Sequence, residues 1–146
     1  MKYTPSSLEE TQKIAQDFIA DLLPKETEAT IVGLYGNLGA GKTTFTQAVA
    51  KALGVEEKVA SPTFVIEKIY ELTHKEFTHL IHIDAYRIDN SSELTLLGFK
   101  EIISNPQNLI LVEWPEKIAD IMPEHIKISL KPLENENSRE IDINTV

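Results

Sequence analysis

The chain has 146 residues, of which 42% are hydrophobic, and this length suits one domain, spanning residues 1–146, with an adequate core. Its 23 acidic and 14 basic residues give a net charge of −9, so the surface lacks the positive charge that autonomous nucleic-acid binding requires. The absence of cysteine excludes disulfides, thiolate catalysis and Cys-ligated zinc, and because no signal-like or membrane-length apolar run occurs, we expect a soluble cytoplasmic protein that does not enter membranes.

The first expected element is an amphipathic helix. Ser7-Leu8-Glu9-Glu10 has the spacing of a capping box, and Leu23-Pro24 marks the expected end of the helix. Thr11 is the only polar member of the stripe on the buried face and, from spacing alone, is interpreted as a tolerated edge position. The stripe consists of Leu8, Thr11, Ile14, Ala15, Phe18, Ile19 and Leu22.

The next feature is the segment Gly-Asn-Leu-Gly-Ala-Gly-Lys-Thr at 36–43, which fits G-x-x-x-x-G-K-[ST] without a mismatch. An apolar run at 30–35 predicts a buried strand before it, and helical periodicity over 43–53, followed by Gly54, predicts a helix after it. The glycines allow backbone N–H groups to converge on phosphate oxygens. Lys42 supplies charge for the β- and γ-phosphates, and the Thr43 hydroxyl is suited to Mg²⁺. The segment therefore predicts a nucleoside-triphosphate site.

The remaining chain alternates between β-rich and helical patterns. Two β-rich runs around a short polar loop predict an antiparallel hairpin, and a continuous apolar run ending in an acid predicts a central parallel strand. We expect an α/β fold like that of P-loop NTPases: a three-layer sandwich whose central mixed sheet has a parallel core and antiparallel edge hairpins. The expected elements are a hairpin over 65–72 and 80–84, a helix over 91–103, a strand over 109–115, a short helix over 116–121, and a closing hairpin over 126–130 and 141–143 at one end of the sheet.

A P-loop needs a second acid near Mg²⁺, at the carboxyl end of a neighbouring strand. Asp84 and Glu113 both follow apolar runs. We prefer Glu113 for the metal, either directly or through water, because its run is more hydrophobic and contains no histidine. Asp84 would then orient a water or a metal-bound ligand, and the alternative for either acid is a strand-end cap or an ion pair.

Several other polar or aromatic positions have two interpretations. Thr63 fits an ordinary turn, although its hydroxyl can also reach Mg²⁺ or a γ-phosphate from a switch segment. Arg87 fits an ion pair better than a γ-phosphate contact. His79 and His82 point to opposite faces of a strand, which argues against a metal site built from protein ligands alone. Trp114 fits core packing, or contact with a nucleotide or partner.

Five motifs in this order resemble the TsaE family, the bacterial ATPase of the tRNA threonylcarbamoyladenosine (t6A) pathway. The resemblance covers about residues 6–120, and the C-terminal hairpin matches only in general character. The motifs are Leu-Glu-Glu-Thr at 8–11, Gly-Asn-Leu-Gly-Ala-Gly-Lys-Thr-Thr at 36–44, Ser-Pro-Thr-Phe at 61–64, His-Ile-Asp-Ala-Tyr-Arg at 82–87, and Val-Glu-Trp-Pro-Glu-Lys at 112–117.

The resemblance implies roles for individual residues. Thr11 would lie at the adenine end of an ATP site, and Thr43 and Glu113 would hold Mg²⁺. Thr63 would belong to a switch-like loop, Asp84 would support hydrolysis, and Trp114 would stand beside the site. The residues that would surround the phosphates are Gly39, Ala40, Gly41, Lys42, Thr43 and Thr44.

The resemblance also implies partners. TsaE proteins work with TsaB and TsaD, which hold the tRNA and the threonylcarbamoyl chemistry, and the ATP cycle keeps that assembly turning over on adenosine 37 of tRNAs that read codons beginning with A. An acidic chain that reaches tRNA only through partners is consistent with this arrangement. No arginine is clearly placed as an internal finger, so we expect ATP hydrolysis to be slow alone and activated by the partners.

Two other function classes compete with a partner-activated ATPase. A small-molecule kinase normally gathers several arginines around its phosphates, and this chain has only Arg87 and Arg139. A non-hydrolysing nucleotide-dependent assembly switch would not need the two acids. A GTPase is not expected, because the guanine-reading segment Asn-Lys-x-Asp does not occur.

Overall fold

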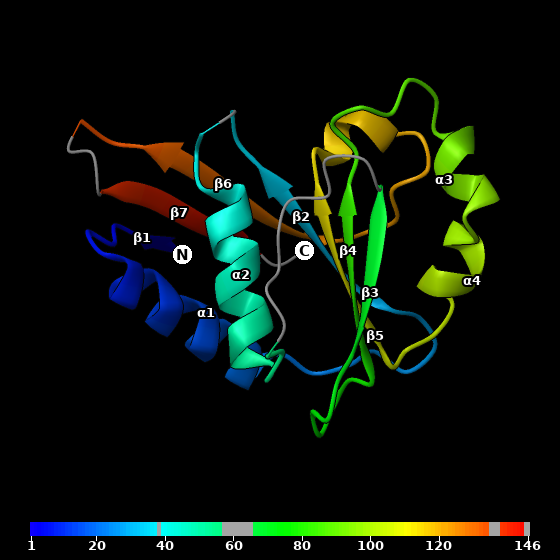
Figure 1. Cartoon of the computed structure of the whole chain (residues 1–146), viewed down its shortest axis with the longest axis horizontal. Helices are drawn as coiled ribbons and strands as arrows, with labels where there is room; N and C mark the ends of the chain where they lie inside the picture. The colour runs from blue at the N-terminus through cyan, green and yellow to red at the C-terminus, as the bar shows by residue number, and fades with distance from the viewer. Residues whose placement is uncertain (38, 57–65, 135–137, 145–146) are drawn as a thin grey trace.

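The computed structural model describes residues 1–37, 39–56, 66–134 and 138–144, which form a seven-stranded mixed sheet (Figure 1). The strand order is β1-β7-β6-β2-β5-β4-β3. The neighbours β6, β2, β5 and β4 run parallel, whereas β3, β7 and β1 pair antiparallel with their neighbours. The predicted parallel core with antiparallel edges is confirmed. The strands are β1 (Lys2–Tyr3), β2 (Thr30–Tyr35), β3 (Glu67–Glu71), β4 (His79–Asp84), β5 (Asn108–Glu113), β6 (Ile126–Pro132) and β7 (Arg139–Asn144).

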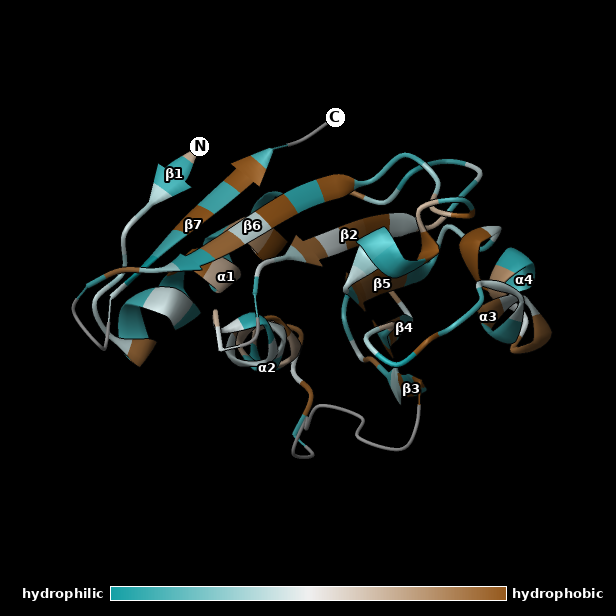
Figure 2. Cartoon of the chain, turned by 90° about the horizontal axis from the view of Figure 1, so that it is seen from above, coloured by the Kyte–Doolittle hydropathy of each residue, from teal (hydrophilic) through white to brown (hydrophobic). Residues whose placement is uncertain are grey.

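Helices cover both faces of the sheet, which gives the three layers that Figure 2 shows. One face carries α1 (Leu8–Asp21) and α2 (Lys42–Ala52), which pack against each other. The other carries α3 (Ser92–Leu96), α4 (Phe99–Ile103) and the 3₁₀ turn η1 (Pro115–Ile118). In the part of the chain that the structure describes, no helix is long and apolar enough to cross a membrane.

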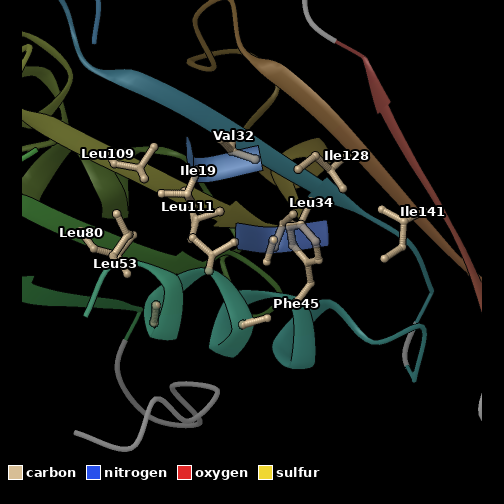
Figure 3. Packing of buried hydrophobic residues seen from close by; sticks show 14 of the residues in the cluster. Ile19, Val32, Leu34, Phe45, Leu53, Leu80, Leu109, Leu111, Ile128 and Ile141 are labelled. Carbon is tan, nitrogen blue, oxygen red and sulfur yellow. The ribbon is translucent and has the colours of Figure 1, made fainter. Parts of the chain in front are cut away.

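The central strands are apolar throughout because both of their faces are covered. Side chains alternate between the two faces, so Leu34 and Leu111 pack with Phe45 of α2 in one cluster (Figure 3). Ile110 and Val112 point the other way and join the cluster under α4 and η1. Every residue of β5 is buried, as expected for the strand that leads to Glu113.

Local signals set most helix boundaries but failed in the second half of the chain. The Ser7 side chain accepts from the backbone N–H of Glu10, which confirms the predicted cap of α1. The helix predicted over 91–103 is wrong: Gly98 adopts φ +83°, a left-handed conformation that separates α3 from α4. The helix predicted over 116–121 is only the short turn η1.

The edges of the sheet also differ from expectation in one respect. The antiparallel pairs β3–β4 and β6–β7 confirm both predicted hairpins. However, the two-residue strand β1 pairs outside β7, so the C-terminal hairpin does not form the edge of the sheet. Two residues are too few to produce a periodic sequence signal.

Replacing Leu111 by Ala should lower the free energy of unfolding by about 2–5 kcal/mol, because a fully buried side chain of β5 would leave a cavity between the sheet and α2. Leu96→Ala is the matched control: Leu96 is 87% exposed, and its loss should change the free energy by less than about 0.5 kcal/mol. Urea unfolding followed by circular dichroism measures both. Equal effects would contradict the assigned core.

Candidate functional site

The candidate site lies where the parallel strands end. Glu113, the last residue of β5, is in register with Leu34 of β2 on one side and with Asp84 of β4 on the other. The chain then leaves β2 through the glycine loop (residues 36–41) and enters α2 at Lys42. In open α/β sheets, the carboxyl ends of parallel strands form the usual ligand-binding edge.

Two glycines of this loop occupy positions that strongly favour glycine. Gly36 has φ +150°, and a Cβ there would lie 2.6 Å from the carbonyl oxygen of Leu130 in β6. Gly41 is the N-cap of α2 with φ +98°, in the left-handed region. These backbone conformations form the tight turn that brings the chain from the strand to the start of the helix.

The side chain of Lys42 folds back over the loop and does not extend into solvent. Its side chain is buried, the ammonium group donates to the carbonyl oxygen of Gly36, and Nζ lies 3.5 Å from the centroid of the Trp114 ring. Burial lowers the pKa of Lys42, and the nearby carboxylates of Glu113, Glu116 and Asp84 oppose that shift. The site therefore has a buried cation that interacts with a carbonyl dipole and an aromatic face.

Glu113 is the acid that the fold brings to the start of α2. Its side chain is 3% exposed, and its Oε1 accepts from the Thr43 hydroxyl at 3.4 Å. Asp84 is half-buried, and its Oδ1 accepts from the backbone N–H of Tyr86 at 3.0 Å, which stabilises the turn after β4. The two acids are adjacent in register, and the hydrogen bond from Thr43 selects Glu113 as the acid beside the start of α2.

His82 is a site residue that the sequence analysis did not identify. Its side chain is fully buried, and its Nε2 lies 2.6 Å from Oε2 of Glu113. A carboxylate oxygen only accepts, so we assign the proton to Nε2. Side chains alternate between the two faces of a strand, so residues 82 and 84 share one face of β4. This alternation could have indicated that His82 lies near the end of β5. Thr43 and His82 therefore hold opposite oxygens of Glu113.

Trp114 forms the turn that follows Glu113. It has φ +60° and is the only non-glycine residue with positive φ in the described ranges. The ring also packs against Tyr86, with centroids 5.0 Å apart. A left-handed conformation costs a non-glycine residue on the order of 1–3 kcal/mol, so the surrounding contacts hold it in place. The predicted core packing is confirmed, since the indole packs against a buried cluster and also covers Lys42; contact with a nucleotide or partner stays a prediction.

The other side of the glycine loop has a cavity of about 300 Å³. Thr11 is buried, and its hydroxyl donates to the carbonyl oxygen of Ser7 at 3.2 Å. The cavity brings Thr11 together with Thr44 of α2 and with Arg139, a residue that sequence reasoning did not connect with the loop. Its lining residues are Ser6, Ser7, Leu8, Thr11, Thr44 and Arg139.

Two predicted positions remain: one lies outside the described residues, and the other is not among these contacts. Thr63 and the rest of 57–65 lie outside the described residues, so its predicted role stays a prediction. Arg87 lies three residues beyond Asp84 and is exposed.

The donor set at Thr43 and Glu113 suits one kind of metal. Among residues 1–37, 39–56, 66–134 and 138–144, no group of three or more His, Asp or Glu side chains can hold an ion. A hydroxyl and a carboxylate oxygen 3.4 Å apart are instead the ligand types of Mg²⁺, which is usually bound by one or two protein groups together with waters and phosphate oxygens.

A buried parallel strand that leads through a glycine loop into a helix, within a three-layer mixed sheet, defines the P-loop-like class of α/β proteins. The family model for "Threonylcarbamoyl adenosine biosynthesis protein TsaE" matches residues 5–141. The chain belongs to the TsaE family.

Individual relatives agree with this assignment. The tRNA threonylcarbamoyladenosine biosynthesis protein TsaE of Bacillus subtilis is 37% identical, over 100% of this chain and 86% of the relative. The protein of the same name from Aquifex aeolicus is 41% identical, over 76% of this chain and 74% of the relative. The crystal structure of Bacillus subtilis YdiB superposes with a TM-score of 0.77 at 31% identity, and covers 100% of this chain and 85% of that one.

Replacing His82 by Phe should leave Oε2 of Glu113 without its buried donor, at a cost of about 1–3 kcal/mol in the free energy of unfolding. His82→Gln keeps an amide donor of similar reach and should lose clearly less. Urea unfolding at pH 7 compares the two variants. Equal losses would show that the hydrogen bond between His82 and Glu113 does not stabilise the fold.

Proposed function

We propose that this protein binds and hydrolyses Mg²⁺-ATP and thereby supports the t6A modification of tRNA. The observation that carries the proposal is the convergence of Lys42, Thr43 and Glu113 at the end of the glycine loop, with Thr43 Oγ1 and Glu113 Oε1 3.4 Å apart. This combination of an ammonium group, a hydroxyl and a carboxylate is the one that P-loop chemistry requires. Membership of a family named for threonylcarbamoyl adenosine biosynthesis supports the pathway.

Each residue would have a distinct task in ATP hydrolysis. The loop amides of residues 39–44 would surround the phosphates, and Lys42 would exchange its contacts with Gly36 and Trp114 for phosphate oxygens. Thr43 and Glu113 would hold Mg²⁺, which neutralises charge on the β and γ oxygens when it is bound. Thr11 would lie at the adenine end of the site, beside the cavity.

Asp84 would orient the attacking water. Hydrolysis forms a bond between the water oxygen and the γ-phosphorus and breaks the bond from that phosphorus to the bridging oxygen, so that ADP and inorganic phosphate leave. Because the transition state spreads negative charge over the transferred group, Lys42 and the loop amides would stabilise it more than they stabilise the bound substrate. The Thr63 hydroxyl, on the predicted switch-like segment, would approach the same group.

The partners we propose are proteins of the TsaB and TsaD type, which would hold the tRNA. A chain with a net charge of −9 is poorly suited to bind RNA by itself, and the relatives are named as tRNA threonylcarbamoyladenosine biosynthesis proteins. This assembly would act in the cytoplasm, where tRNA is modified.

Replacing Glu113 by Ala should lower the rate of Mg²⁺-dependent phosphate release at least about 100-fold and should leave measurable ATP binding, because the loop amides that contact phosphate remain. Asp84→Ala is the comparison variant and should lower turnover while keeping the Mg²⁺-dependent gain in ATP affinity. Phosphate release and calorimetric titration with ATP, in Mg²⁺ and in EDTA, measure these effects. If Asp84→Ala loses the Mg²⁺-dependent affinity and Glu113→Ala behaves like wild type, the metal assignment is reversed.

Saturating TsaB–TsaD complex should raise the rate of phosphate release at least about tenfold, since a stabilising charge supplied by a partner contributes about 10³–10⁵ in related enzymes. The rate is measured with the chain alone, with TsaB–TsaD, and with TsaB–TsaD and tRNA. The Lys42→Ala variant is the control for contaminating ATPases. An unchanged rate with the partners would argue against a partner-activated ATPase, and a phosphorylated acceptor in place of free phosphate would indicate a kinase.

A further inference from the structure

Arg139, the first residue of β7, lies against the last glycine of the loop. A Cβ at Gly41 would collide with Nη1 of Arg139 and would lie 2.9 Å from its Cζ. The guanidinium therefore occupies the space that a side chain at position 41 would fill. Gly41 is the N-cap of α2, so this positive charge sits at the start of the helix.

The main chain of Arg139 is anchored while part of its guanidinium is unpaired. Its backbone N–H donates to the carbonyl oxygen of Pro5 at 3.2 Å, and it pairs with Pro132 across the β6–β7 hairpin. Its Nη1 is buried and has no hydrogen-bond partner among the residues that the structure describes. Since arginine stays charged at any physiological pH, a buried N–H group of this kind favours an anionic acceptor.

The guanidinium also lines the cavity of about 300 Å³ beside the loop. None of the residues that line this cavity takes part in the contacts that Glu113 makes with Thr43 and His82, or in those of Lys42. The cavity also carries four hydroxyl side chains, and its volume lies at the lower end of the range for small-molecule sites. Lys42 and Glu113 therefore lie on one side of the loop, and Arg139 with the cavity lies on the other.

We propose that Arg139 binds the α-phosphate of the nucleotide, with the ribose and base in the adjoining cavity. This inference rests on the proposed function, in which Lys42, Thr43 and Glu113 serve the β- and γ-phosphates. The α-phosphate is the remaining anionic group of ATP, and a guanidinium matches two of its oxygens at once. ADP and ATP share that phosphate, so Arg139 should contribute equally to the affinity for both and should not contribute to the step at the γ-phosphate.

The test compares R139Q and R139K with K131Q. Lys131 pairs with Glu140 in the same hairpin and therefore points to the opposite face from Arg139, so K131Q removes the same charge away from the cavity. Calorimetric titrations measure the Kd for ADP and for ATP, in Mg²⁺ and in EDTA, and phosphate release gives kcat at saturating ATP.

R139Q should raise the Kd for ADP and for ATP by the same factor, roughly tenfold or more, in Mg²⁺ and in EDTA, with kcat within about twofold of wild type. R139K keeps the positive charge but loses the paired N–H donors of the guanidinium, so its Kd for ADP and ATP should fall between those of wild type and R139Q. If R139Q does not fold, the Kd of R139K tests the assignment instead. K131Q should bind ADP and ATP with the wild-type Kd and should keep the wild-type kcat.

Three results would overturn the assignment. A lower kcat with an unchanged Kd for ADP would move Arg139 to the γ-phosphate. Unchanged affinity and turnover in R139Q would show that Arg139 only packs against the loop. The proposed function would still stand in that case, provided that the wild-type protein binds ADP and ATP. Wild-type protein that binds neither ADP nor ATP would overturn the proposed function and this assignment with it.

Discussion

The buried carboxylate of Glu113 is the group on which the rest of the site depends. An ionised carboxylate away from water is costly unless both of its oxygens have donors, and here Thr43 serves one oxygen while His82 serves the other. Thr43 belongs to α2 and His82 to β4, whereas Glu113 ends β5. The two hydrogen bonds therefore form only when these three elements are assembled. The strand order and the parallel direction of β2, β5 and β4 are what bring them together. The geometry of the site is therefore a consequence of sheet topology, and a local motif alone would not produce it.

A site of this kind needs positive charge in a chain whose net charge is −9. The fold concentrates two cations around one loop and holds them by different means. Lys42 follows the loop directly, and its long side chain is held by a carbonyl and an aromatic ring, contacts that are easily exchanged. Arg139 arrives on β7, with its main chain fixed by Pro5 and by β6. In the proposed reaction, a lysine that changes partners would suit the reacting end of a polyphosphate, whereas a guanidinium carried on an anchored strand would suit a group that stays in place through turnover.

The features that could be predicted from the sequence are those determined by residues close together in the chain. The strand–loop–helix unit at 30–53 is determined by neighbouring residues, so it could be predicted, and so could both hairpins. Glu113 was preferred over Asp84 because of the unbroken apolar run before it, and the structure joins Glu113 to Thr43. The contact of Arg139 with the loop was not found, because it spans a large separation in sequence that no periodicity encodes. His82 was considered only as a metal ligand, although its place on the same face of β4 as Asp84 was a signal that it lies near the end of β5. The break at Gly98 was missed because apolar spacing continues across a residue whose backbone turns away.

Trp114 links the fixed acid to the exchangeable lysine. Its left-handed backbone turns the chain immediately after Glu113, so that the indole extends over Lys42 and the next residues begin η1. A conformation that is unfavourable for a residue with a side chain persists only where other contacts outweigh it, and here those contacts include the Tyr86 ring, the Lys42 ammonium and the buried cluster under η1. If Lys42 moves to phosphate oxygens, the contact between its ammonium group and the indole is lost. Occupancy of the loop would thus change the contacts of the residue that directly follows Glu113.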